Sequence, residues 1–497
     1  MGPSLDFSTW TWTLLVVLVT LFVVYIYWPY KTFYTLGVPG PKPIPFFGTM
    51  LAYRKGIVDF DVACAKKYGK TWGIYDGRQP ILIITDRDMI KTVMIKECYS
   101  LFTNRRNVGL LGPLYDAVSM AEDHTWRRIR AILSPSFTSG RLKEMFPIIQ
   151  RHSANLVSSM KKKADMNEAL DLKEFFGPYS MDVVTSTSFS VDIDSLSNPS
   201  DPFVTNIKKM VKFDILNPLF LALAFFPFLG PIFEKLELSF FPASVTDFFY
   251  AALQKIKVSR ENSKQSSRVD FLQLMMDSQR SAGGDKDKGL SDHEILSQAM
   301  IFIFAGYETS SSTLGFLAYN LATNPHVMKR LQEEVDATFP KQGPVQYQEL
   351  MQMDYLDSVI NESLRLYPIV PRLDRVAKAT MEINGQVIHK GMVVMVPIWC
   401  LHRDPEYWPQ PEEFKPERFS RENKASIDPY TYMPFGMGPR NCIGMRFALL
   451  TMKLALVEIL QRYNFCVCEE TQVPIEMDLS GLLAPKLPLM LKLEPRS

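Results

Sequence analysis

The residues best suited to chemistry lie in one loop near the C-terminus. The loop reads Pro-Phe-Gly-Met-Gly-Pro-Arg-Asn-Cys-Ile-Gly over 434–444, and an apolar helix is predicted from Ile443 to Leu460. Cys442 therefore lies at a helix N-terminus, where unpaired N–H groups and the helix dipole stabilise a thiolate, and Arg440 adds positive charge. Such a thiolate could be a nucleophile, a redox thiol or a ligand for a soft metal. None of the six histidines lies near this loop in sequence, which favours the metal ligand.

A second group lies on a long apolar helix predicted from Ser291 to Asn324, which opens with a capping box. Ile301, Ala305 and Thr309 follow one another at intervals of four and therefore share a face. Glu308 precedes Thr309, and an acid and an alcohol beside an apolar cavity can relay protons. The alternative is a core threonine that bonds back to its own helix.

Two further pairs are weak signals by themselves. Glu362 and Arg365 are three residues apart on a predicted helix, so that their charges can meet. Trp126 and Arg130 lie one turn apart on another. Neither pair indicates a function unless it is considered together with the cysteine loop.

The cysteine loop resembles the haem-thiolate loop of the cytochrome P-450 monooxygenases, Phe-x-x-Gly-x-Arg-x-Cys-x-Gly. The matching residues are Phe435, Gly438, Arg440, Cys442 and Gly444. The resemblance extends over the whole chain and is closest to the vertebrate microsomal family 3, subfamily A. It implies the cytochrome P-450 fold, mainly α with small β-sheets, and haem b (heme b, iron protoporphyrin IX) with Cys442 as its metal ligand.

The resemblance also implies roles for other residues. Glu308 and Thr309 match the family's catalytic acid–alcohol pair. The propionates of the haem should meet Arg105, Trp126, Arg130, Arg375 and Arg440. Glu362, Arg365 and Arg418 match a buried structural network behind the haem, in which the loss of one partner should cost about 3–5 kcal/mol.

The substrate pocket is implied by the same resemblance. Its expected lining is Ser119, Lys212, Phe213, Ile301, Phe304, Ala305, Thr309, Ile369, Val370, Arg372, Asp374 and Leu482. Two departures from mammalian members make substrate preference less transferable than chemistry. Asn107-Val108-Gly109 stands where they carry Pro-Phe-Gly, and Lys212 stands where they carry Arg.

The implied reaction is monooxygenation of lipophilic compounds, including steroids, drugs and other xenobiotics. The chain has no Gly-x-Gly-x-x-Gly or Walker-type loop, so NADPH and flavin should bind a separate protein. The resemblance names NADPH–cytochrome reductase, with cytochrome b5 as a further candidate. A basic docking face could comprise Lys91, Lys96, Arg127, Arg128 and Arg446, which could equally be solvated charges. The alternatives are a haem-thiolate isomerase or synthase of the prostanoid type, and a non-catalytic haem-binding sensor or carrier.

The N-terminal segment is predicted to anchor the chain in a membrane. No charged residue occurs from Phe7 to Tyr30, which is long enough to cross about 30 Å of hydrocarbon. We predict a single transmembrane anchor over 1–30, a proline-rich hinge over 31–45 and a haem-thiolate catalytic domain over 46–497. The leader carries no Lys or Arg, which argues against a cleaved signal peptide. The basic residues after the anchor place the body on the cytoplasmic side of the endoplasmic reticulum membrane.

Composition sets outer limits. The chain has 497 residues, 47% hydrophobic and 22% charged, with a net charge of +2, so it is globular and an unlikely binder of nucleic acid. Six cysteines are too few for a disulfide scaffold and lack zinc-site spacing. Strands are predicted over 71–76, 81–85, 382–388 and 392–396, and a surface loop over 281–289. Ten Phe fall within 213–249, where some rings should line a cavity or touch the membrane.

Overall fold

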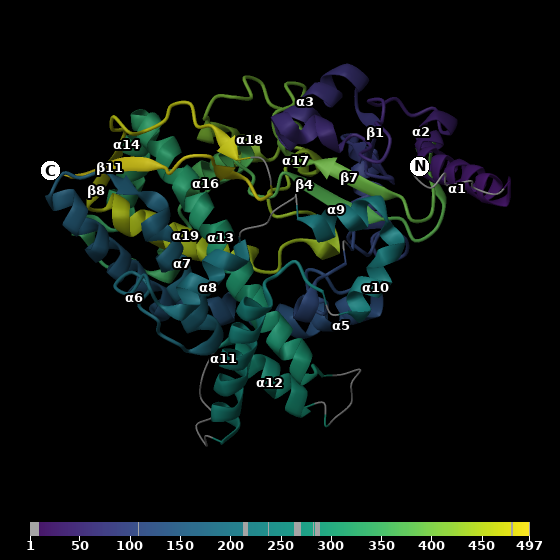
Figure 1. Cartoon of the computed structure of the whole chain (residues 1–497). Coiled ribbons are helices and arrows are strands. Elements are labelled where there is room, and N and C mark those ends of the chain that lie inside the picture. Colours follow the sequence, from purple (N-terminus) through teal and green to yellow (C-terminus); the bar gives the residue numbers. More distant parts are fainter. Residues whose placement is uncertain are drawn as a thin grey trace, which may run out of the picture.

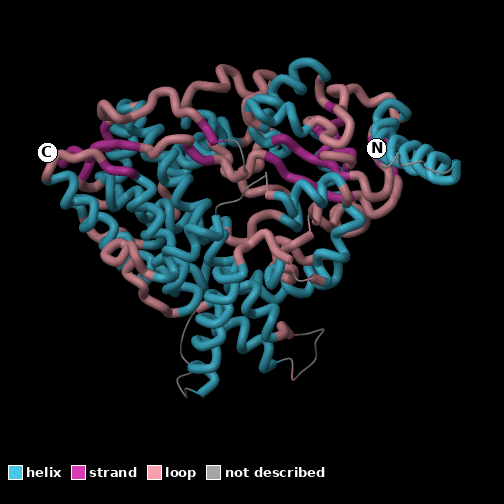
Figure 2. Tube along the Cα trace, in the orientation of Figure 1, coloured by secondary structure: helices cyan, strands magenta, loops and turns pink. Residues whose placement is uncertain are grey.

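The computed structural model describes residues 9–107, 109–211, 217–236, 238–262, 270–281, 283, 289–478 and 481–496. Helices form most of the body, and the strands gather along one side of it (Figure 2). The predicted class, mainly α with small β-sheets, is therefore confirmed. Lys212, Phe213 and most of the predicted loop over 281–289 lie outside the described residues.

The N-terminal helix α1 (Thr9–Tyr27) projects from the body (Figure 1). Of its residues, Ile26 is the one that is buried. The helical run Thr9–Thr35 is long and apolar enough to cross a membrane, as the sequence predicts. It ends in the short helix α2 (Lys31–Thr35), so the first part of the predicted hinge is helical.

The proline-rich stretch that follows is packed against the body rather than free. Pro39 O accepts a hydrogen bond from Gly73 N at 2.9 Å. A Cβ at Gly40 would lie 2.1 Å from Gly73 O, so this approach requires glycine. Phe33 of α2 packs under the same strand.

Aromatic side chains join the end of the anchor to the phenylalanine-rich segment. The Tyr25 hydroxyl donates to Phe225 O at 3.3 Å, and its ring stacks on Phe226 with centroids 6.4 Å apart. Arg78 holds Tyr25 from the body side, because its Nε donates to Tyr25 O at 3.0 Å and its guanidinium lies 3.4 Å from the ring centroid. Phe228 remains 61% exposed beside this cluster.

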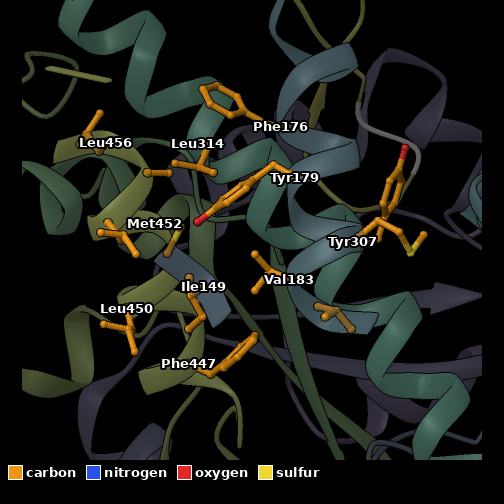
Figure 3. Packing of buried hydrophobic residues seen from close by; sticks show 14 of the residues in the cluster. Ile149, Phe176, Tyr179, Val183, Tyr307, Leu314, Phe447, Leu450, Met452 and Leu456 are labelled. Atoms are coloured by element: carbon orange, nitrogen blue, oxygen red, sulfur yellow. The ribbon is translucent and has the colours of Figure 1, made fainter. Parts of the chain in front are cut away.

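The core is built around the long helix α13 (Asp292–Thr323), whose predicted capping box is present between Ser291 and Glu294. It packs against α7 (Leu172–Phe189), with α6 (Ser139–Asp165), α16 (Asp354–Leu366) and α19 (Met445–Leu460) around them. Figure 3 shows Tyr179 of α7 pointing toward Met452 of α19 with Leu314 of α13 nearby. The Tyr179 hydroxyl donates to Thr451 O at 2.9 Å.

The main sheet has the strand order β1 (Thr71–Asp76), β2 (Gln79–Ile84), β7 (Val393–Pro397) and β4 (Arg372–Val376). The predicted strands over 71–76 and 81–85 are present and pair as the antiparallel hairpin β1–β2, with Thr71 opposite Ile84. The strand predicted over 382–388 is instead the hairpin of β5 (Met381–Ile383) and β6 (Gln386–Ile388), because the chain turns through positive φ at Asn384 and Gly385.

The remaining elements complete the body. Besides β5–β6, one smaller sheet contains β3 (Leu170–Asp171), β11 (Met490–Pro495) and β8 (Tyr463–Cys466), and another pairs β10 (Ala484–Pro485) with β9 (Met477–Asp478). The other helices are α3 (Ile57–Tyr68), α4 (Arg87–Lys91), α5 (Asp123–Leu133), α8 (Pro202–Val211), α9 (Pro218–Phe225), α10 (Gly230–Lys235), α11 (Ala243–Asn262), α12 (Phe271–Ser281), α14 (Pro325–Thr338), α15 (Tyr347–Leu350), α17 (Ile398–Leu401) and α18 (Arg421–Lys424).

The contact between α13 and α7 depends on Gly306. A Cβ there would lie 2.3 Å from Val184 Cγ2, and valine is stiff about χ1. We expect Gly306→Ala to lower the free energy of unfolding by about 1–3 kcal/mol through overpacking. Val184→Ala in the same chain should restore most of the loss. Thermal and denaturant unfolding of the holoprotein would measure both.

Gly140→Ala on α6 is the matched control, because no atom lies within 4 Å of its added Cβ. Equal losses at positions 140 and 306, or no rescue by the valine change, would contradict the steric explanation.

Candidate active site

The cysteine loop follows the 3-10 turn Pro429–Thr431 and leads into α19. Gly436 and Gly438 both have positive φ, at 73° and 71°. A Cβ at Gly438 would lie 2.0 Å from Met94 O, so only glycine permits this approach. Cys442 N donates to Phe435 O at 2.8 Å, and α19 begins three residues later at Met445.

The Cys442 side chain is exposed, yet protein surrounds the thiol closely. Burial raises the pKa of this thiol, while backbone N–H groups of Gly444 and Met445 and the charges of Arg130 and Arg105 lower it. These donors favour a thiolate that is bound to a cation over a free thiol. The geometry therefore suits a single-cysteine metal ligand.

Predicted propionate contacts converge on this loop. Arg105 Nη2 donates to Arg440 O at 3.2 Å, and Arg130 Nη1 donates to Asn441 O at 2.9 Å. The Arg440 guanidinium lies 4.2 Å from the Trp126 ring centroid. Four of the five predicted propionate residues are thus joined through direct contacts around residues 440–442.

The fifth, Arg375, belongs to the same cluster electrostatically. Burial and the charge of Arg105 lower the pKa of Arg375 to about 10. Burial and the charges of Arg105 and Arg375 lower the pKa of Arg440 to about 9. Arg375 is 1% exposed, and its Nε has no hydrogen-bond partner among the described residues.

Two buried cations, Arg375 and Arg440, repel each other and the half-buried Arg105, and together with the unsatisfied Nε–H of Arg375 they favour an anion at this place. A ligand with two carboxylates beside a thiolate-bound iron supplies such an anion. The residues present therefore fit haem, whose propionates would be held by this cluster.

The predicted helix face is present on α13. Ala305 is exposed, Phe304 is half-buried and Ile301 is buried. Thr309 is half-buried, and its Oγ1 donates to Ala305 O at 2.6 Å. A small residue followed by a hydroxyl thus leaves open space along this part of the helix.

The adjoining acid points elsewhere. Glu308 is buried, and its Oε1 accepts from Lys173 Nζ on α7 at 2.7 Å and from Ser312 Oγ at 3.1 Å. Lys173 Nζ also donates to Ser311 Oγ at 2.9 Å. Burial lowers the pKa of Lys173, and Glu308 opposes this shift. The sequence analysis did not find Lys173, because nothing local marks a lysine whose partner is 135 residues away.

α13 and α19 are held beside each other by aromatic packing. Phe271 of α12 contacts Phe302 of α13 at 5.7 Å and Phe447 of α19 at 5.9 Å between ring centroids. Phe302 precedes Ala305 by three residues, and Phe447 follows Cys442 by five. The thiol loop and the Ala305–Thr309 face therefore belong to one site.

The structural network is fully assembled behind this site. Glu362 and Arg365 both have side chains 0% exposed and meet at 2.7 Å. Arg418 Nε reaches Glu362 Oε1 at 3.2 Å. Arg365 also donates to His402 O and Pro411 O, so that its charge is completely enclosed by partners.

The predicted substrate residues are placed unevenly. Ile369 is buried and its O accepts from Leu483 N at 2.8 Å, which brings the half-buried Leu482 and Val370 into the same region. Ser119 Oγ is buried and has no partner among the described residues.

Two charged members of that set are already engaged. Both Asp61 oxygens accept from Arg372 at 2.6 Å. Asp374 Oδ2 accepts from Arg106 N, also at 2.6 Å. The Arg372 guanidinium is therefore committed to α3 and is not available to substrate.

The proposed basic docking face also loses one member. Arg128 pairs with Glu294 and has a side chain only 13% exposed. Arg128 is thus a structural residue, since its charge is neutralised inside the body. Lys96, Arg127 and Arg446 are exposed, and Lys91 is half-buried.

Comparison with known proteins identifies the family of the chain. A family model described as Cytochrome P450 matches residues 38–493, so the chain belongs to the cytochrome P450 family. Proteins named Cytochrome P450 3A40 from Oryzias latipes and 3A30 from Fundulus heteroclitus are each 74% identical to it, over 100% and 98% of this chain and 99% and 98% of their own. Cytochrome P450 3A12 from Canis lupus familiaris is 56% identical over 99% of this chain and 98% of its own.

The relatives' names agree on a subfamily, and the chain is a family 3A cytochrome P450. It is accordingly a haem b-binding monooxygenase, an oxidoreductase that takes lipophilic substrates and electrons from a reductase. The isomerase or synthase alternative and the sensor alternative are not favoured.

The cationic cluster predicts how firmly haem is retained. We expect Arg375→Met to speed haem loss about tenfold or more, because a charge-assisted bond contributes about 1.5–3 kcal/mol. Transfer of haem from the holoprotein to an excess of a haem-scavenging apoglobin, followed by absorbance, measures this rate. Arg127→Met, an exposed neighbour of Trp126, should leave the rate unchanged. If the parent chain, Arg375→Met and Arg127→Met lost haem at the same rate, Arg375 would not be a haem contact.

The Lys173–Glu308 pair predicts a coupling between two helices. We expect Lys173→Met to be destabilising in the parent chain and much less so in the Glu308→Gln chain. The expected coupling is about 1 kcal/mol, reduced because the Lys173 side chain is 39% exposed. Denaturant unfolding of the four proteins gives the value.

The exposed pair Lys161–Asp165 on α6 serves as the control, with an expected coupling below about 0.5 kcal/mol. The inference that Glu308 is held by Lys173 would be abandoned if both cycles gave the same coupling.

Proposed function

We propose that this chain is anchored in the endoplasmic reticulum membrane with its body in the cytoplasm, where it oxidises steroids and foreign lipophilic compounds. NADPH–cytochrome reductase supplies the electrons, and cytochrome b5 is a second donor. The observation that carries the proposal is the joining of the Cys442 loop, its arginine cluster and the Ala305–Thr309 face of α13 in one site.

Bound haem, with electrons and O₂, supplies the oxidising chemistry. Cys442 would hold the iron as a thiolate, and Arg105, Trp126, Arg130, Arg375 and Arg440 would hold the propionates. These contacts would hold the cofactor against the loop. They would also give the buried guanidinium groups of the cluster anionic partners.

Proton delivery falls to Thr309 and Glu308. The Thr309 hydroxyl donates to Ala305 O, which leaves its oxygen free to accept a proton donor. Glu308 is linked through Lys173, which is 39% exposed, to the outside of the body. A proton therefore has a route from solvent through Lys173 and Glu308 to the face of α13 that carries Thr309. The last step requires the Glu308 side chain to rearrange.

Substrate contact is assigned to apolar side chains. Ile301, Phe304, Ala305, Ile369, Val370 and Leu482 form the pocket that we propose, with Thr309 at the reacting end. Ser119 offers a hydroxyl that has no partner among the described residues and that suits an oxygen atom of a steroid. Asp374 is included with its oxygen already bonded to Arg106 N.

The decisive experiment uses the full chain in membranes. Dithionite and carbon monoxide should produce a strongly red-shifted Soret band, which Cys442→His should abolish. Steroid oxidation should require both NADPH and reductase. Thr309→Ala should lower product formed per NADPH about tenfold or more, because a positioned proton donor contributes that much or greater.

Other outcomes point to other functions. Conversion of a peroxide without NADPH would indicate an isomerase. NADPH consumption stimulated by substrate, with no oxidised product, would indicate a sensor or carrier.

A further inference from the structure

A cavity of about 1060 Å³ lies outside the site described above. Its walls are residues 107–125 on one side and the start of α11 on the other, with Glu294 of α13 between them. None of the described residues assigned to substrate lines it. α11 projects from the lower part of the body in Figure 1, and the cavity adjoins its base.

Hydrogen bonds hold the two walls together. Phe240 N donates to Leu110 O at 2.9 Å, and Leu111 pairs with Ser239 as an isolated β-bridge. A Cβ at Gly112 would lie 2.8 Å from Ser239 Oγ, so the walls meet closely at this edge. The cavity is therefore a defined feature of the fold.

Its charge has one sign. Four carboxylates line it, namely Asp116, Glu122, Asp247 and Glu294, and no Lys, Arg or His is among its described lining residues. Two of the four have partners behind the wall, since Asp116 Oδ2 meets His293 Nδ1 at 2.7 Å and Glu294 pairs with Arg128. Asp247, which forms no ion pair among the described residues, contributes a negative charge to the lining.

One of these acids is incompletely satisfied. Asp116 is 7% exposed, and its Oδ1 has no hydrogen-bond partner among the described residues. Burial raises the pKa of its carboxyl, and a cation brought into the cavity would oppose that shift. Asp247 is exposed on α11 and has no ion pair among the described residues.

The rest of the lining is apolar and aromatic. Tyr250 presents a ring that is 38% exposed, and such rings attract cations over their faces. The Tyr115 ring is 61% exposed, and His293 stacks on one of its faces with centroids 4.8 Å apart, so only the opposite face is offered to a ligand. The aliphatic lining consists of Leu110, Leu111, Met120 and Leu238. A small hydrated cation would gain nothing from these walls, whereas a bulky organic cation would bury apolar surface against them.

We propose that this cavity binds lipophilic organic cations at a site separate from the substrate pocket. The carboxylates attract the charge, and the tyrosine and leucine side chains hold the apolar body. Phe241, two residues before α11, packs on Phe304 at 6.3 Å between ring centroids, so an occupied cavity adjoins a substrate-lining ring.

The test uses the holoenzyme with an azole that fills the haem site. Tetraphenylphosphonium is the probe, and triphenylphosphine oxide is the uncharged comparison, both followed by equilibrium dialysis. We expect one saturable phosphonium site in the azole-filled enzyme and much weaker binding of the oxide. Asp247→Asn should weaken phosphonium binding about threefold, and Asp247→Lys about tenfold or more.

Glu333→Lys, an exposed position on α14, makes the same charge change far from the cavity lining and should have no effect. The proposal is overturned if saturable binding disappears with the azole, if the oxide binds equally, or if the 247 and 333 variants behave alike. Because dialysis needs no turnover, failure of the monooxygenase assay would not alter this result.

Discussion

The guanidinium groups of the buried Arg375 and Arg440 and of the half-buried Arg105 repel one another, and much of the site follows from how the chain accommodates this repulsion. Arg440 is fixed by bonds to Thr103 O and Ala121 O, and Arg105 by a bond to Arg440 O. Arg375 is fixed by Asp374 O on β4. Backbone carbonyls from separate stretches of the chain thus offset part of the cost of confining the charges, and they bring β4, the segment before α5 and the cysteine loop together around the proposed propionate site.

The need to give a buried charge a partner also separates Glu308 from Thr309, the two members of the acid–alcohol pair. Adjacent residues on a helix point about 100° apart, so Thr309 and Glu308 cannot share one environment. Thr309 stays with the open face at Ala305, whereas Glu308 is drawn to Lys173 across the contact with α7. Gly306 allows that contact to be close enough for the ion pair to form.

Features set by neighbouring residues were predictable from the sequence, including the capping box of α13, the β1–β2 hairpin and the pairing of Glu362 with Arg365. Features that depend on partners far away in the sequence could not be predicted in this way. Strand alternation does not reveal that Asp61 holds Arg372, and a run of arginines on α5 does not reveal that Glu294 neutralises Arg128. The loop motif could identify a thiolate ligand, but only the folded chain shows that Arg105, Arg375 and Arg440 gather beside it.

The contact of Arg78 with Tyr25 would affect how the body meets other proteins at a bilayer surface. A body tethered by a slack linker would tumble, and any protein embedded in the same membrane would have to find it in all orientations. In this chain the β1–β2 hairpin contacts both the proline-rich stretch, through Gly73, and the end of α1, through Arg78. With α1 in a membrane, as proposed, these contacts would keep one face of the body toward the bilayer. The rotational search for a partner would then be about the membrane normal alone instead of about three axes.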